Sequence, residues 1–297
     1  MNHDVYQVIT DRIIGLLENG VVPWQKPWQG GEQMPRNLIS GHEYRGVNVF
    51  LLHAMSYTSP YWLTFNQARE MGGHVKRGER ASPVVFWKRL PVEASGEPDG
   101  KKIIPFLRYY SVFNVEQCED IPADKIPVQN GSKREHCPIQ AAESIVTAMP
   151  KKPEIKHGGG RACYSPGLDC VTMPLPETFR SGQDYYSVLF HELTHSTGHE
   201  SRLNRKGVAG ADGEWSAFGS TPYAREELVA EMGAAFLSGH AGIVERTLDN
   251  SAAYLQSWLA RLKEDTRLIV QAAAAAQKAA DFILGKQFAE SEGEDAK

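Results

Sequence analysis

The chain has 297 residues, of which 41% are hydrophobic and 23% charged, and its formal net charge is −4. This composition is typical of folded globular proteins and excludes a disordered chain, while the length allows one large domain or two ordinary ones. The net charge also excludes a protein that is basic throughout, so any surface for nucleic acid must be local.

The first residues, MNHDVYQVITDRIIGLLENG, lack the basic start and the unbroken apolar run of a secretory signal. No later segment reaches the roughly 18 apolar residues that a membrane span requires. We therefore expect a cytoplasmic protein with no membrane partner. Cys118, Cys137, Cys163 and Cys170 are widely spaced without a CxxC pair, which predicts free thiols in a reducing compartment.

In the N-terminal half, the spacing of apolar residues predicts helices and β-rich strands. Apolar residues recur at helical spacing from Val5 to Glu18, and Asn19-Gly20 follows as a stop signal. Further helices are expected over 48–55 and over 65–71, the second after the cap candidate Thr64. The stretches GGHVKRGERASPVVFWKRL and IIPFLRYYSVFNV are rich in β-forming residues, and the polar EASGEPDGKK between them is typical of a hairpin loop or a longer excursion.

The C-terminal half is expected to be mainly helical. A polar, proline-bearing stretch predicts a linker before the short helix of PIQAAESIVTAM, and RACYSPGLDCVTMP contains β-type pieces. A serine-capped helix is expected in SGQDYYSVLFHELTHSTGH, another over 224–239, and one long helix from about 251 to 284. The predicted fold class is α+β with two domains: an α+β domain over 1–125, a linker over 126–136, a mainly helical domain with a small sheet over 137–288, and an acidic tail over 289–297.

The stretch HELTHSTGHESR, residues 191–202, carries a metal-binding pattern. His191 and His195 are four residues apart, so on a helix both imidazoles leave the same face and can bind one ion. Glu192 lies one step around the helix, where it can take a proton from a water without being a ligand. Because the preceding residues are apolar, the helix is expected to be buried, and two unsatisfied imidazoles there would be costly.

The third ligand must come from elsewhere, because the HExxHxxGxxH pattern would place a histidine where this chain has Ser201. His199 has only a weak claim, since it follows the glycine at which the helix should end. In REELVAEMGAAFL, Glu227 and Glu231 are four residues apart on one helical face. We assign Glu227 as the third ligand and Glu231 as the acceptor that orients a histidine ring, with Glu226 as the alternative ligand.

Three protein ligands leave a fourth position open to water, which is typical of a catalytic zinc site rather than a structural one. The expected ion is Zn2+, and Mn2+ or Co2+ would also suit two histidines and a glutamate. Tyr223, His199 and His240 are candidates for stabilising charge in a transition state. The RACYSPGLDCVTMP segment could supply an edge strand for an extended peptide or protein substrate.

Residues 61–110 carry nine Lys or Arg against five Asp or Glu, with aromatic residues such as Phe86 and Tyr109 among them. Cations that follow the phosphates and rings that stack on bases are typical of single-stranded DNA binding, although rings such as Phe86 could equally be core and the charges simply solvated. PWQKPW and YRG place rings beside cations in the same way. The candidate DNA-binding residues are Trp24, Lys26, Trp28, Tyr44, Arg45, Tyr61, Trp62, Lys76, Arg77, Arg80, Trp87, Lys88 and Arg89.

Taken together, these stretches resemble the ArdC family of antirestriction proteins of conjugative plasmids. PWQKPW, YRGVNVFLL, YWLTFNQAREMGGHVKRGER and VVFWKR resemble the family's single-stranded-DNA-binding domain. RACYSPGLDCVTMP, FHELTHSTGH, REELVAEMGAAFL and YLQSWLARLKED resemble its zincin-like metallopeptidase domain. The resemblance implies that the chain protects incoming DNA from host restriction. It leaves two functions open: protection that uses the peptidase, or protection by DNA binding alone with a structural or catalytically unused metal site.

Overall fold

The fold is described from a computed structural model of the chain. The structure describes residues 4–25, 34–93, 101–127, 138–205, 221–243 and 252–286, without the side chains of 87–93, 101–106, 138, 221 and 222. These residues divide into two compact units. The first contains Met1–Ile13 and Met34–Asn130, and the second contains Ile14–Gln33 and Gly131–Gln287. Helix α1, Val5–Glu18, therefore contributes residues to both units.

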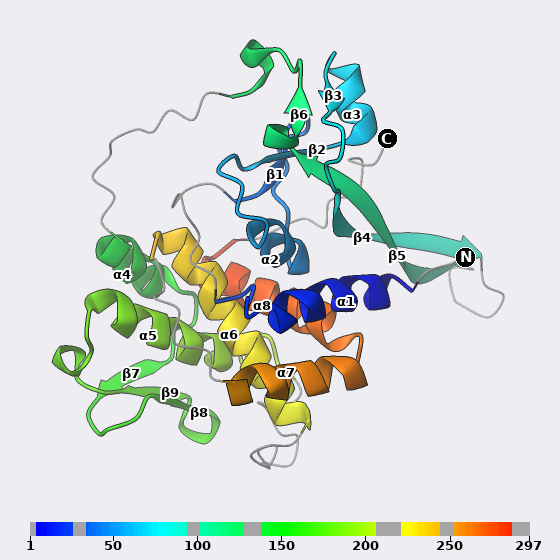
Figure 1. The fold of residues 1–297 in the computed structure, drawn as a ribbon. Helices are drawn as coiled ribbons and strands as arrows, with labels where there is room; N and C mark the ends of the chain where they lie inside the picture. The colour runs from blue at the N-terminus through cyan, green and yellow to red at the C-terminus, as the bar shows by residue number, and fades with distance from the viewer. Residues whose placement is uncertain are drawn as a thin grey trace. The chain divides into compact units, whose positions relative to one another are not determined.

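The first unit is built on a four-stranded sheet of order β1-β2-β5-β4, in which only the β1-β2 pair is parallel. The strands are β1 Arg36–Asn37, β2 Tyr61–Thr64, β4 Ser82–Glu93 and β5 Lys101–Asn114. Strands β4 and β5 form a long antiparallel pair, which Figure 1 shows as an extended hairpin. The two predicted β-rich stretches are thus confirmed as partners, and β4 lies at an edge of the sheet.

Each face of this sheet has its own apolar cluster, because neighbouring residues of a strand point to opposite faces. On one face, Trp62 of β2 packs with Leu52 of helix α2, Val47–His53, and with residues of β4 and β5. On the other face, Leu63 packs with Ala68 of helix α3, Phe65–Glu70. The predicted cap is confirmed, since the Thr64 side chain accepts a hydrogen bond from the Gln67 N–H. Strands β3, His74–Val75, and β6, Cys118–Glu119, form a small second sheet.

The second unit consists of helices around a three-stranded sheet. Its helices are α4 Pro138–Ala148, α5 Gly182–Ser196, α6 Thr221–Ala241, α7 Ala252–Glu264 and α8 Leu268–Ile283. Its strands are β7 Glu154–His157, β8 Cys163–Ser165 and β9 Cys170–Met173, in the order β7-β9-β8. Helix α6 is central because it packs against α4, α5 and α8, while α5 also contacts β8 and β9 (Figure 1). Short 3-10 turns occur at Val115–Gln117, Ala123–Lys125, Pro166–Leu168 and Pro176–Thr178.

Helices α5 and α6 approach each other closely at Gly233. A Cβ atom on Gly233 would lie 2.4 Å from Cγ2 of Thr194 on α5, a separation that atoms do not adopt. Thr194 is fully buried, and its hydroxyl donates to the Phe190 carbonyl within α5. The absence of a side chain at Gly233 therefore lets the backbone of α6 lie directly against α5.

Two expectations about the elements need correction. The predicted single helix over 251–284 is wrong, because α7 ends at Glu264 and α8 begins at Leu268. The Asp265 carboxylate accepts a hydrogen bond from the Arg267 N–H at 2.9 Å, and such local side-chain bonds compete with the helical ladder. The division into units also differs from the predicted boundaries, since the described residues 14–25 belong with the second unit. Most of the predicted linker and all of the acidic tail lie outside the described residues.

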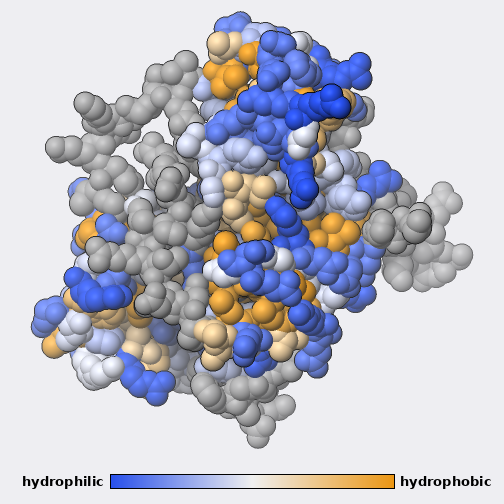
Figure 2. Space-filling model, in the orientation of Figure 1, coloured by the Kyte–Doolittle hydropathy of each residue, from blue (hydrophilic) through white to orange (hydrophobic). Residues whose placement is uncertain are grey.

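On the face shown in Figure 2, hydrophilic residues make up much of the described surface, with apolar residues between them. Among the residues that the structure describes, the large apolar ones that are exposed are Ile39, Phe65, Tyr109, Leu168 and Leu175. Cys118, Cys163 and Cys170 are free thiols as expected, and Cys137 lies outside the described residues. Among the described helices, none combines the length and the apolar character needed to cross a bilayer.

Candidate metal centre

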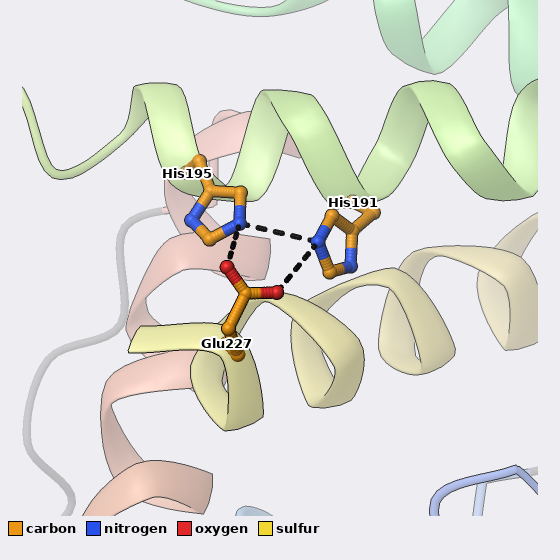
Figure 3. Close-up of side chains that lie close together, drawn as sticks. All are labelled: His191, His195 and Glu227. Carbon is orange, nitrogen blue, oxygen red and sulfur yellow. Dashed lines mark hydrogen bonds and ion pairs between the residues drawn. The ribbon is translucent and has the colours of Figure 1, made fainter. Parts of the chain in front are cut away.

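The two histidines of the predicted pattern lie on α5. The helix begins at the predicted serine cap, where the Ser181 hydroxyl accepts a hydrogen bond from the Asp184 N–H at 3.1 Å. His191 and His195 leave the same face one turn apart, and their Nε2 atoms lie 3.1 Å from each other. Glu227 of α6 points between them, with each carboxylate oxygen 3.6 Å from one Nε2 (Figure 3).

The geometry of these three residues fits a single metal ion. Two ligand atoms held about 2.0–2.1 Å from a tetrahedral zinc lie about 3.3 Å apart, close to the separations of 3.1 and 3.6 Å found here. One ligand atom from each residue lies within 4.8 Å of the other two, and this is the one such cluster that the described residues contain. The structure therefore brings together the three residues assigned as ligands.

The proposed ligands interact electrostatically, since the Glu227 carboxylate lies beside the two histidine rings. Burial alone would lower the pKa of His191, but the hydrogen bond with Glu227 and the charge of Glu192 outweigh it, so the pKa is raised. Burial would likewise raise the pKa of Glu227, yet its contacts with His191 and His195 lower it. A metal ion binds the unprotonated Nε2 of His191, so metal binding is expected to release protons wherever His191 is protonated.

Glu192 is held beside the site by the sheet. Its side chain is buried, and Oε2 accepts a hydrogen bond from the backbone N–H of Tyr164 at 2.8 Å. Tyr164 lies in β8, which is an edge strand of the β7-β9-β8 sheet. One carboxylate oxygen is thus fixed by the backbone of the strand that was expected to lie near a substrate.

The carboxylate that contacts a histidine ring from outside the site is Glu226, and not Glu231 as predicted. Glu226 Oε1 lies 3.3 Å from Nδ1 of His195. Glu231 lies one turn further along α6, where its Oε2 accepts hydrogen bonds from the Trp24 indole N–H at 2.8 Å and from the Tyr254 hydroxyl at 2.6 Å. Glu231 therefore influences His191 only through its charge, which raises the pKa of that histidine.

Three further polar residues were expected near the reacting atoms, and one is found there. Tyr223 forms a hydrogen bond that contributes to the low pKa of Glu227, and burial raises the pKa of the Tyr223 hydroxyl itself. His199 instead contacts the Ser201 hydroxyl at 2.8 Å. His240 contacts the Phe236 carbonyl and the Lys286 amine. Of these, Tyr223 alone contacts a proposed ligand within the described residues.

Several of the predicted DNA-binding rings belong to cores. Trp24 is 1% exposed and packs edge-on against Trp258 in the second unit, with ring centroids 6.1 Å apart. Trp62 is 2% exposed, and Tyr44 packs against the same cluster. Neither tryptophan ring is available to stack on a base, so we remove both from the candidate DNA surface. Tyr61 is partly buried against the second apolar cluster.

The cationic candidates are more accessible. Arg77 and Arg80 are exposed, while Arg45 and Lys76 are partly buried, and the Lys76 amine donates to the Glu116 carbonyl at 2.9 Å. Trp87, Lys88 and Arg89 occupy positions on β4 whose side chains lie outside the described structure. Lys26 and Trp28 also lie outside the described residues.

Comparisons with known proteins agree with this arrangement. Residues 3–113 match the model of the N-terminal domain of anti-restriction factor ArdC, and residues 140–275 match that of a zincin-like metallopeptidase. The metal-free crystal structure of the antirestriction ArdC protein from plasmid R388 is 39% identical, with a TM-score of 0.72, over 96% of this chain and 100% of that one. The chain belongs to the ArdC family of antirestriction proteins.

Other relatives include longer proteins, of which this chain matches only a part, and one protein of similar length. Two DNA primases named TraC from Escherichia coli are 33% and 34% identical over 94% of this chain, which spans 20% and 27% of their lengths. An uncharacterised protein, y4eC, of Sinorhizobium fredii is 33% identical over 96% of this chain and 92% of its own length. A Mn(II)-bound crystal structure of the R388 ArdC protein matches as well as the metal-free one, with a TM-score of 0.72.

Proposed function

We propose that this ArdC-family chain protects incoming plasmid DNA from host restriction through two activities. The first unit binds single-stranded DNA, and the second hydrolyses a peptide bond in a protein substrate, in the cytoplasm of the cell that receives the DNA. The observation that carries the proposal is the convergence of His191, His195 and Glu227 beside the buried Glu192. A ligand set that leaves a position for water is typical of catalytic metal sites.

His191, His195 and Glu227 would hold the ion, for which zinc is our first choice. A zinc ion held there would lower the pKa of a coordinated water to about 7. Glu192 accepts the proton of the attacking water, since the Tyr164 N–H already holds one of its oxygens and leaves the other available. The Tyr223 hydroxyl hydrogen-bonds the ligand Glu227 and has a pKa raised by burial, so it is our candidate donor for stabilising an oxyanion.

An extended peptide is the substrate form that suits this site. Strand β8 is at an edge of its sheet, and Glu192 is bonded to its central residue. A peptide added alongside β8 would lie next to Glu192 and the ligands. If the first unit holds DNA, a protein bound to the same DNA is presented to the peptidase at a high effective concentration.

The DNA surface is proposed on exposed side chains of the first unit. Arg77 and Arg80 supply positive charge, and Tyr109 and Phe65, 39% and 49% exposed, supply rings on which bases can stack. Titration of a labelled single-stranded oligonucleotide at two salt concentrations tests this. Affinity should fall as salt rises, because phosphate contacts release counterions. An affinity that salt does not change would contradict phosphate binding.

Substitution of the base tests whether protection uses the peptidase. Glu192→Gln should retain bound metal and single-stranded DNA binding, while peptide hydrolysis falls by about 10²–10⁴-fold, the usual contribution of a general base. Restriction of DNA entering cells that carry Glu192→Gln is then compared with the wild type. Loss of protection supports the proposal. Full protection would mean that DNA binding protects without peptide hydrolysis.

A further inference from the structure

Arg205 occupies an unusual position for a charged residue, since its side chain is 13% exposed and lies behind the metal ligands. It follows the loop that leaves α5. Its Nε donates to Glu226 Oε2 at 3.1 Å and its Nη2 donates to Glu226 Oε1, so the guanidinium binds both carboxylate oxygens. The remaining donors reach the Thr194 carbonyl at 2.9 Å and the Thr197 hydroxyl. Arg205 thus connects the end of α5 to the start of α6.

The same carboxylate contacts a metal ligand. Glu226 Oε1 lies 3.3 Å from His195 Nδ1, on the opposite side of the ring from Nε2, which faces His191 and Glu227. A carboxylate at Nδ1 favours the tautomer with the proton on Nδ1, and this leaves the Nε2 lone pair for a metal.

We propose that Arg205 is a positioning residue of the metal site: by binding both oxygens of Glu226, it holds that carboxylate against His195 Nδ1 and away from the metal. This inference rests on the proposed metal site. Glu226 is adjacent in sequence to the ligand Glu227, so the site has one carboxylate more than a three-ligand centre needs. Without Arg205, Glu226 would be a buried charge without its counterion, which is strongly unfavourable.

The forked geometry makes arginine specifically suited to this task. A guanidinium presents two parallel donors that match a carboxylate, whereas the lysine ammonium is a single point charge. Arg205→Lys keeps the positive charge and loses the pair of donors that bind both Glu226 oxygens. Glu226→Gln keeps an acceptor for His195 and Arg205 but loses the charge. Both changes should weaken the hold on the His195 ring.

The chain offers a matched control three residues away. Arg202 has a side chain that is 1% exposed and also binds both oxygens of a carboxylate, that of Asp169, at 2.8 and 3.0 Å. Neither Arg202 nor Asp169 contacts a proposed ligand within the described residues. Arg202→Lys therefore removes another two-point contact between an arginine and a carboxylate from the same loop, without changing a partner of His195.

Zinc affinity, measured by competition with a chelating dye on the full-length folded protein, tests the proposal. Arg205→Lys and Glu226→Gln should each bind zinc about 10–100-fold more weakly, the usual cost of losing an outer-sphere partner. Arg202→Lys should lose stability and keep the wild-type affinity. Wild-type affinity in folded Arg205→Lys, or an equal loss in Arg202→Lys, would overturn the proposal. If Arg205→Lys does not fold, Glu226→Gln decides in the same way.

A second measurement needs no variant. In metal-free wild-type protein, the long-range nitrogen–proton NMR correlations of His195 should show a proton on Nδ1, and an Nδ1 without a proton would overturn the inference. These readouts are separable from the proposed function. A wild-type protein that binds zinc yet hydrolyses no peptide refutes the peptidase and leaves the role of Arg205 intact. A wild type that binds no zinc refutes the proposed site, while the tautomer of His195 still tests whether Glu226 lies against Nδ1.

Discussion

Glu226 and Glu227 are identical neighbours on α6, yet their side chains contact different partners. Successive residues of a helix are rotated by about 100° about its axis. Glu227 therefore faces the Nε2 atoms of both histidines, while Glu226 faces the back of His195 and the Arg205 guanidinium. At this scale, the direction of a single side chain decides between a proposed ligand and a partner of a ligand.

Substitutions of the buried Trp24 and of the exposed Tyr109 should have opposite effects on stability and on DNA affinity. Trp24→Phe removes the indole N–H that binds Glu231, so stability should fall by about 1–3 kcal/mol while affinity for single-stranded DNA stays at the wild-type value. Tyr109→Ala removes an exposed ring, so DNA affinity should fall by about 1–3 kcal/mol with little change in stability. Denaturant unfolding and oligonucleotide titration on both variants measure the two effects. Weakened DNA binding in Trp24→Phe would return that ring to the DNA surface.

At the level of elements, the site depends on how closely two helices pack. Gly233→Ala would place a methyl group against the β-branched Thr194 side chain, so α5 and α6 would have to move apart. We expect a loss of about 1–3 kcal/mol in stability from overpacking. Zinc affinity should fall with it, because Glu227 is carried by α6 and the two histidines by α5.

Gly15→Ala is the control for this prediction. Gly15 lies inside α1, and a Cβ there would meet no atom within 4 Å. Alanine is the better helix former, so this variant should gain about 0.5–1 kcal/mol and bind zinc like the wild type. Chemical denaturation and chelator competition measure both variants. An unchanged stability in Gly233→Ala would mean that the helices are not held as closely as described.

At the scale of the whole molecule, metal binding should stabilise one unit selectively. The proposed ligands all belong to the second unit, and a ligand that binds only the folded state at 100 times its Kd adds about 2.7 kcal/mol. In calorimetry, a chelator should lower the Tm of that unit and added zinc should restore it. His191→Ala should abolish the shift. A Tm that changes with neither chelator nor zinc would contradict a metal site in this unit.

Local features of this protein could be predicted from the sequence because they depend on residues a few positions apart. Helix α1, the caps at Thr64 and Ser181, the β4-β5 strands and the helical spacing of His191 and His195 are of this kind. The break between α7 and α8 is not predicted, because the helical pattern continues through it, while the Asp265 carboxylate accepts a hydrogen bond from the Arg267 N–H.

The sequence by itself determined that two histidines and a glutamate share a helical turn, and that an acidic pair follows downstream. Only the tertiary structure decided that Glu227 faces the histidines, that Glu226 and Arg205 lie behind them, and that Trp24 lies in a core beside Glu231. These contacts join residues 21 to 207 positions apart. The local periodicity of the sequence cannot predict such pairs, because they depend on the packing of α6 against α5 and on where residues 14–25 lie.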